Sequence, residues 1–103
     1  MITVITTLHK KEDAVRIGKG LLQKHLIACY NFWPIESSYW WKGKLLEGIE
    51  TMMLLKSTSE KFDAIAEYIK TESGYEVPDA YSLAADHTHP AFEQWVTESV
   101  RPR

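Results

Sequence analysis

The stretch from Leu26 to Lys56 constrains the fold of this chain more than any other, because it reads as one long β-hairpin. Trp41-Lys42-Gly43-Lys44 supplies a two-residue turn in which Gly43 can adopt the positive φ that a primed turn requires. Residues that favour strands flank this turn: Tyr39, Trp40, Trp41, Leu45 and Leu46. We therefore expect a hairpin arm around which the rest of the chain is organised.

The outgoing strand of the hairpin, residues 45–56, is too long to stay flat inside a domain of this size. It reaches roughly 40 Å at about 3.3 Å per residue, whereas a domain of about 100 residues has a radius of gyration of roughly 13 Å. The arm must therefore bend or reach onto another chain. We also expect Pro34 to interrupt the incoming strand, because proline cannot donate to a central hydrogen-bond ladder.

The end of the arm, Met52-Met53-Leu54-Leu55, is apolar without alternation, which predicts burial on both faces of the sheet. Helices of the same chain can cover one face, and a neighbouring subunit is the simplest cover for the other. This pattern and the aromatic tip favour a homo-oligomer. The residues expected to mark the oligomer arm are Trp40, Trp41, Met53 and Leu54. The alternative is a small internal core with an ordinary methionine-rich strand.

Strands and helices alternate in the rest of the chain. The expected elements are a strand over 2–8, a helix over 12–24, the hairpin, a helix from Ser57 to Ser73-Gly74, a strand over 80–85, a helix opened by His89-Pro90 and a short tail over 101–103. The second helix should begin with a capping box made by Ser57 and Glu60, or with Ser59 as an alternative cap. Gly18 on the first helix predicts close packing on the sheet. The order β-α-β-β-α-β with a C-terminal helix is that of an α+β, ferredoxin-like fold with an antiparallel sheet and both main helices on one face.

Composition sets the broad class of protein. The 103 residues are 45% hydrophobic, enough for one globular domain over residues 1–103. The net charge of −2 gives no electrostatic footprint for nucleic acid or an anionic membrane, and no apolar run approaches the length of a membrane span. The first residues have no positive leader region, so we expect no signal peptide. The single cysteine, Cys29, fits a reducing compartment, and we expect a cytoplasmic protein.

Few local motifs carry chemistry. Asp86-His87-Thr88-His89 could bind Cu(II) or Zn(II) through its two imidazoles and a carboxylate. The alternative is a solvated loop in which His89 caps the following helix. Cys29 on a strand is typical of a small buried apolar residue. No spacing suggests a nucleophilic triad, so we do not expect an enzyme.

Several stretches together match one known family. They are Leu26-Ile27-Ala28-Cys29 with Asn31, Pro34-Ile35, Ser37-Ser38-Tyr39, Trp41-Lys42-Gly43-Lys44, Glu50 with Met53-Leu54-Leu55-Lys56, Tyr75-Glu76-Val77-Pro78, and Trp95. On these residues nearly the whole chain resembles the CutA family of divalent-cation tolerance proteins. The resemblance implies a ferredoxin-like subunit, a very stable homotrimer similar in architecture to PII signalling proteins, and a link to copper and other divalent cations.

The chain departs from the family at its copper ligands. Members that bind copper resemble one another in a cysteine at the end of the first strand and histidines just before the Tyr-x-x-Pro turn. Those positions here hold Thr6 or Thr7 and Ser73-Gly74, which offer no good copper ligand. Any copper that the protein holds should therefore depend on His87 and His89.

The resemblance also places a polar set in crevices between subunits: Cys29, Tyr39, Glu50 and Lys56. Glu50 and Lys56 lie an even number of residues apart on one strand, so both should face the same side of the sheet. They could bind a small anion or metabolite, or they could form ion pairs that fix the register of the trimer. Three functions remain open: a trimer in copper and divalent-cation tolerance, a PII-like sensor of a metabolite, and a structural or adaptor trimer without a ligand.

Overall fold

Four antiparallel strands in the order β2-β3-β1-β4 form the centre of the computed structural model, which describes residues 1–101. They are β1 (Ile2–Leu8), β2 (Cys29–Trp41), β3 (Lys44–Ser57) and β4 (Tyr81–Ala84). The α+β, ferredoxin-like prediction is confirmed, including the two crossings that put β1 and β3 in the middle. The predicted domain and its predicted tail both extend to residue 103, and residues 102 and 103 lie outside the described part of the chain.

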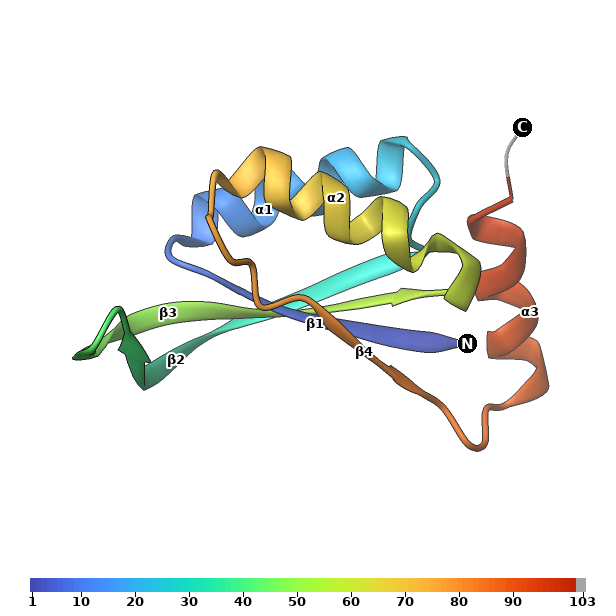
Figure 1. The fold of residues 1–103 in the computed structure, drawn as a ribbon. Coiled ribbons are helices and arrows are strands. Elements are labelled where there is room, and N and C mark those ends of the chain that lie inside the picture. The colour runs from blue at the N-terminus through green and yellow to red at the C-terminus, as the bar shows by residue number, and fades with distance from the viewer. Residues whose placement is uncertain (102–103) are drawn as a thin grey trace.

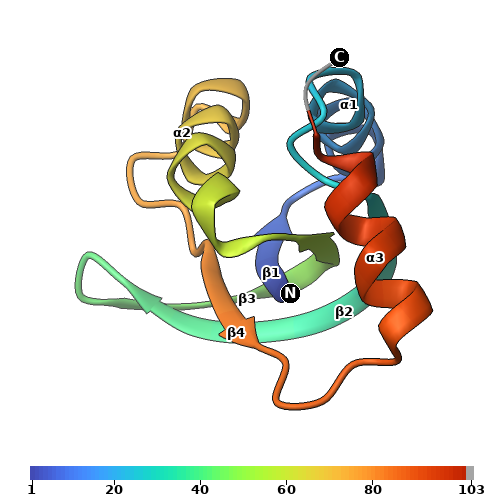
Figure 2. The same cartoon turned by 90° about the vertical axis from the view of Figure 1, so that its right-hand side faces the viewer.

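Two helices, α1 (Lys11–Gln23) and α2 (Phe62–Ser73), lie side by side on one face of the sheet (Figures 1 and 2). A third helix, α3 (Pro90–Ser99), packs at the end of the sheet where β1 begins. The main core lies between the sheet and the first two helices: Ile2, Val4, Leu8, Ala14, Ile17, Leu21, Ile27, Met53, Leu55, Ile65 and Ile69. No helix within residues 1–101 is both long and apolar enough to cross a membrane.

Alternate residues of the inner strands are buried, as expected for a sheet with one covered face. Along β3, Thr51, Met53, Leu55 and Ser57 are buried under the helices, and the residues between them are partly exposed. The four apolar residues at the end of the arm are therefore covered on only one face by their own chain. We call the other side of the sheet, opposite α1 and α2, the open face.

The predicted hairpin arm is present and projects beyond the body of the chain (Figure 1). β3 pairs with β1 only from Thr51 onward, so residues 35–50 form a two-stranded ribbon. The ribbon contributes to a longest dimension of 44 Å, against 27 and 20 Å across. At its tip Lys42 and Gly43 have φ values of 50° and 78°, the two positive angles of the predicted primed turn.

The prediction that Pro34 interrupts the incoming strand was wrong. β2 runs without a break from Cys29 to Trp41, and Pro34 lies opposite Thr51 within the ladder. β2 is an edge strand, where proline is tolerated because its missing N–H can face away from the only neighbouring strand.

The predicted capping box of the second helix was also wrong. Ser57 is the last residue of β3, is fully buried, and donates its hydroxyl to the carbonyl of Leu26 at 2.6 Å. Glu60 instead accepts from the hydroxyl of Thr58 at 2.8 Å, and a short 3₁₀ turn (Ser59–Lys61) leads into α2. The predicted stop is confirmed, because Gly74 caps α2 with a φ of 72°.

Candidate functional site

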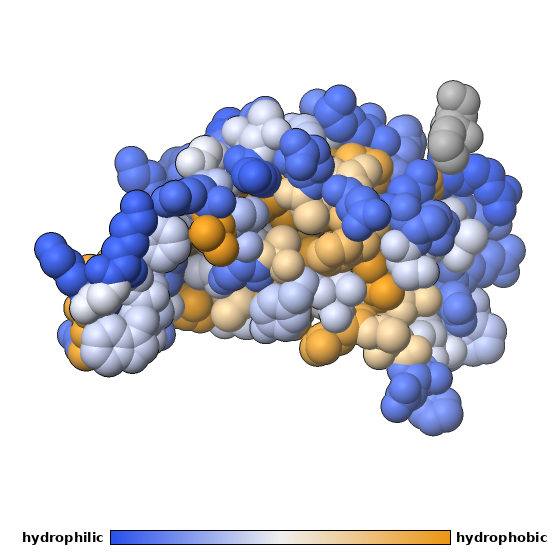
Figure 3. Space-filling model, in the orientation of Figure 1, coloured by the Kyte–Doolittle hydropathy of each residue, from blue (hydrophilic) through white to orange (hydrophobic). Residues whose placement is uncertain are grey.

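The open face carries apolar residues that residues 1–101 leave uncovered. Cross-strand pairing places Ile5 beside Leu54 and Thr7 beside Met52 on this side of the sheet. The strongly exposed apolar residues on its strands are Trp33, Tyr81 and Leu83. Figure 3, in which the open face points downward, shows hydrophobic residues along the side of the sheet and hydrophilic residues over the helices above. Both edge strands, β2 and β4, also end the sheet with one unpaired side.

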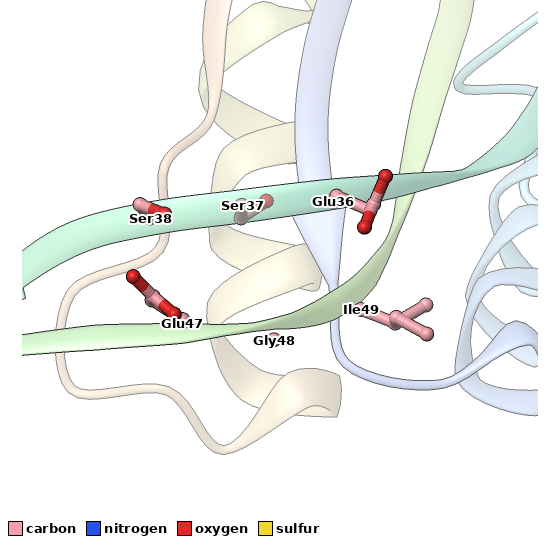
Figure 4. A pocket seen from close by; sticks show the side chains of 6 residues that line it. All are labelled: Glu36, Ser37, Ser38, Glu47, Gly48 and Ile49. Atoms are coloured by element: carbon pink, nitrogen blue, oxygen red, sulfur yellow. The ribbon is translucent and has the colours of Figure 1, made fainter.

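The ribbon carries exposed aromatic and aliphatic residues on the side that continues the helix-covered face of the sheet. Trp40 is 73% exposed at the tip, and Ile49 is 75% exposed nearer the body. A hollow of about 350 Å³ lies on the ribbon and is lined by Glu36, Ser37, Ser38, Glu47, Gly48 and Ile49 (Figure 4). Of the residues predicted to mark the oligomer arm, Trp40, Trp41 and Leu54 reach the surface, whereas Met53 is sealed in the core of its own chain.

The four predicted crevice residues occupy three separate places in one chain. Cys29 and Lys56 lie directly opposite each other on β2 and β3, at the end of the sheet far from the arm tip. The ammonium group of Lys56 donates to the amide oxygen of Asn31 at 2.6 Å. Tyr39 lies near the tip, opposite Leu46. The fold therefore brings together Cys29 and Lys56 and leaves Tyr39 apart.

Glu50, the fourth of these residues, lies at the root of the ribbon. Its carboxylate is 3.6 Å from Nδ1 of His9, and its side chain is only 13% exposed. His9 also donates its backbone N–H to the Tyr75 hydroxyl at 2.7 Å, and the two rings meet edge to face at 5.0 Å. Burial raises the pKa of the Tyr75 hydroxyl, and the neighbouring carboxylates of Asp13, Glu50 and Asp79 raise it further, against the lowering effect of the His9 hydrogen bond.

The positions at which the resemblance implied copper ligands hold hydrogen-bonded hydroxyl groups in this chain. Thr6 donates its hydroxyl to the Asp79 carboxylate at 3.1 Å, and Thr7 donates its backbone N–H to the same oxygen at 2.8 Å. Ser73 accepts a hydrogen bond from the backbone of Tyr75 at 3.2 Å. These groups tie the segment after α2 to the end of β1 and add no nitrogen or sulfur ligand.

The second predicted metal candidate is the loop before α3. His89 is the N-cap of α3, and its Nδ1 accepts the backbone N–H of Ala91 at 3.1 Å, which leaves only Nε2 for a metal. Asp86 and His87 are exposed in the same loop. Within residues 1–101 no three His, Cys, Asp or Glu side chains lie close enough together to hold a metal ion.

Sequence reasoning missed His9 and Asp79 as parts of the site. His9 meets Tyr75 across 66 positions of sequence, and Thr6 meets Asp79 across 73. No local pattern signals such contacts. The Tyr-x-x-Pro stretch was recognised, but its partners at the end of β1 became visible only in the fold.

The fold and this surface define a class: small ferredoxin-like subunits with a long β-ribbon and one uncovered sheet face. A profile of the CutA1 divalent ion tolerance protein family matches residues 2–99, and the chain belongs to this family. The divalent-cation tolerance protein CutA of Thermotoga maritima is 37% identical over 97% of this chain and 99% of its own.

Solved structures agree with this assignment. The periplasmic divalent cation tolerance protein CutA of Archaeoglobus fulgidus superposes with a TM-score of 0.94 at 34% identity, over 98% of this chain and 100% of that one. The PII-like protein CutA of Nostoc sp. PCC 7120 superposes with a TM-score of 0.90 at 24% identity, over 98% of both chains. The second comparison shows a likeness of fold alone.

Proposed function

We propose that the protein is a non-enzymatic homotrimer that contributes to tolerance of divalent cations, with copper as the first ion to test. Membership of the CutA1 family supports this proposal, as does the name of the Thermotoga relative. A cytoplasmic location is part of the proposal and rests on the single cysteine; the Archaeoglobus relative is described as periplasmic. Cell fractionation with an antibody against the protein would decide the location.

The proposal of a trimer rests on a single observation, the uncovered open face of the sheet. A monomer in water would expose Trp33, Tyr81 and Leu83 on one side of the sheet and Trp40 on the ribbon. Exposed apolar patches of this kind mark interaction sites, and a second copy of the chain supplies a matching patch and a ribbon long enough to lie on it. Sedimentation velocity tests the assembly: a stable mass of 11.9 kDa at micromolar concentration would contradict it.

The metal part of the proposal does not include a resident copper centre in one chain. The family's ligand positions hold hydroxyl groups that already make hydrogen bonds, and neutral oxygens compete poorly with water for copper. The loop with His87 and His89 offers at most two imidazoles. Calorimetric titration of the assembled, metal-free protein with Cu(II) and Zn(II) tests this part, with the His87→Ala/His89→Ala variant as the comparison.

A PII-like sensor is the second candidate function. Lys56 places an ammonium group on the open face, next to Asn31 and opposite Cys29. In a trimer such a group could meet Tyr39 or Glu50 of a neighbouring copy and bind a small anion there. A metabolite that raises the melting temperature of wild type but not of a Lys56→Gln variant would favour the sensor. Stabilisation by neither metals nor metabolites would favour a trimer that acts as an adaptor without a ligand.

A further inference from the structure

A second hollow, separate from the copper-ligand position and from the predicted crevice residues, lies where α1 begins above the edge strand β2. Its volume is about 320 Å³, and it is lined by Lys11, Phe32, Trp33, Pro34 and Thr51. We call it the α1 hollow. The volume is at the lower end of the range for small-molecule pockets, which suits a ligand with one aromatic ring. Three of the five lining residues offer mainly carbon surface, as a site for such a ring would.

The hollow also has a positive end. Lys11, the first residue of α1, contributes an ammonium group. The N-cap of this helix, Lys10, makes no side-chain hydrogen bond to the first turn, so the helix has no side-chain cap and its first N–H groups carry the positive end of the helix dipole. The first-turn carboxylates of Glu12 and Asp13 weaken this field, but neither lines the hollow, and Asp13 lies 3.4 Å from the guanidinium of Arg16.

The hydroxyl group of Thr51 gives the hollow a second polar group, independent of Lys11. Thr51 occupies a buried position of β3 at which its neighbours in the same row, Met53 and Leu55, are apolar, and it is only 6% exposed. Its hydroxyl makes no hydrogen bond to any side chain or backbone group of residues 1–101. No sealed side-chain oxygen or nitrogen in this part of the chain lacks a partner, so the Thr51 hydroxyl reaches the accessible surface, and that surface is the wall of the hollow. A ligand in the hollow can therefore form a hydrogen bond with this hydroxyl.

We propose that the α1 hollow binds a small aromatic anion. The ring lies against Phe32 and Pro34, the carboxylate or phosphate group lies toward Lys11 and the start of α1, and the Thr51 hydroxyl forms a hydrogen bond with the ligand. Carboxylates and phosphates are both bound by helix N-termini and lysine, so the shared chemistry is an anionic group on one ring. The five lining residues all come from one chain, and the site does not depend on copper.

Binding of four probes to the assembled protein tests the proposal: benzoate, phenyl phosphate, neutral benzamide and inorganic phosphate, each measured by calorimetry and by NMR shifts. We expect at least one aromatic anion to bind and benzamide to bind about tenfold more weakly or worse, since a charged hydrogen bond is lost. Binding of benzoate alone assigns a carboxylate ligand, and binding of phenyl phosphate alone assigns a phosphate ligand. Inorganic phosphate should bind more weakly than either because it lacks the ring.

Matched variants assign the site. Lys11→Gln should weaken binding of the aromatic anion by about tenfold, whereas Lys19→Gln, which removes the same charge from an exposed position of α1 outside the hollow, should leave binding unchanged. Thr51→Val should weaken binding, and Thr51→Ser, which keeps the hydroxyl, should restore it even if the valine variant melts earlier. The proposal is overturned if neither anion binds at millimolar concentration, or if Lys11→Gln and Lys19→Gln have equal effects.

Discussion

Met53 and Leu54 are consecutive residues of β3 that face opposite sides of the sheet, and only Met53 is fully covered by its own chain. Met53 is 0% exposed in the core beneath the helices. Leu54 lies between Ile5 and Asn31 on the open face and is partly exposed. The two neighbours therefore separate the interactions that hold the subunit together from those available to a second copy.

A lysine at each of these positions should have a different effect. Met53→Lys places an unpaired charge in the core, so we expect loss of the fold, with a cost of about 3–5 kcal/mol. Leu54→Lys places the charge on the open face, so we expect the subunit to keep its circular dichroism spectrum and lose its oligomeric state. Circular dichroism and sedimentation velocity on both variants would check this. A Leu54→Lys protein with the mass of wild type would show that the open face is not the interface.

Gly18 allows α1 to lie close to the sheet. A Cβ at this position would come within 2.7 Å of three ring atoms of Tyr30, although Ala is by itself the better helix former, by about 1 kcal/mol. We expect overpacking to win, so that Gly18→Ala lowers the free energy of unfolding by about 1–3 kcal/mol. Urea denaturation would measure the loss. Lys19→Ala, at an exposed position of the same helix, is the control and should change stability little.

Ionisation of Tyr75 should lower the free energy of unfolding at alkaline pH. Burial and the neighbouring carboxylates raise its pKa above the ordinary value of 10.0, so the folded protein holds the phenolic proton more tightly than the unfolded chain. The resulting stabilisation is fully present below pH 10, and it is lost as the pH rises through the raised pKa of the folded state. Urea denaturation between about pH 9 and pH 11 should show this loss in wild type and less of it in Tyr75→Phe. Tyr39→Phe, on the arm, should keep the wild-type profile.

Most of the fold followed from residue patterns of short range. The turn at Lys42-Gly43, the end of α2 at Gly74 and the cap of α3 at His89 are each specified by residues within a few positions, so their prediction was confirmed. Pro34 was misread because its effect depends on whether the strand lies at the edge of the sheet. That property belongs to strand order, which no local pattern contains.

The candidate site was less accessible to prediction. The capping box failed because Ser57 is drawn into the core by a hydrogen bond to Leu26, a contact that spans 31 positions of sequence. The contacts of Tyr75 and Asp79 with the end of β1 are longer still. The alternation of buried and exposed residues in β3 could not be read from the sequence. Met52 and Leu54 are apolar although they lie on the face that the chain itself does not cover. The apolar residues of the open face thus conceal the alternation of buried and exposed positions in β3.

Copper binding should be weak and should depend on the loop before α3. Cu(I) prefers thiolate or thioether ligands, and Cu(II) prefers imidazole with nitrogen or oxygen partners. The hydroxyls of Thr6 and Ser73 offer neither and are already hydrogen bonded. Calorimetry with Cu(II) should therefore give no submicromolar site in wild type, and His87→Ala/His89→Ala should remove most of the weak binding that remains. His9→Gln is the matched control, because His9 lies beside Glu50 at the root of the ribbon. Submicromolar binding that survives the double variant would contradict this reasoning, and Cys29→Ser would then test the one thiol in the chain.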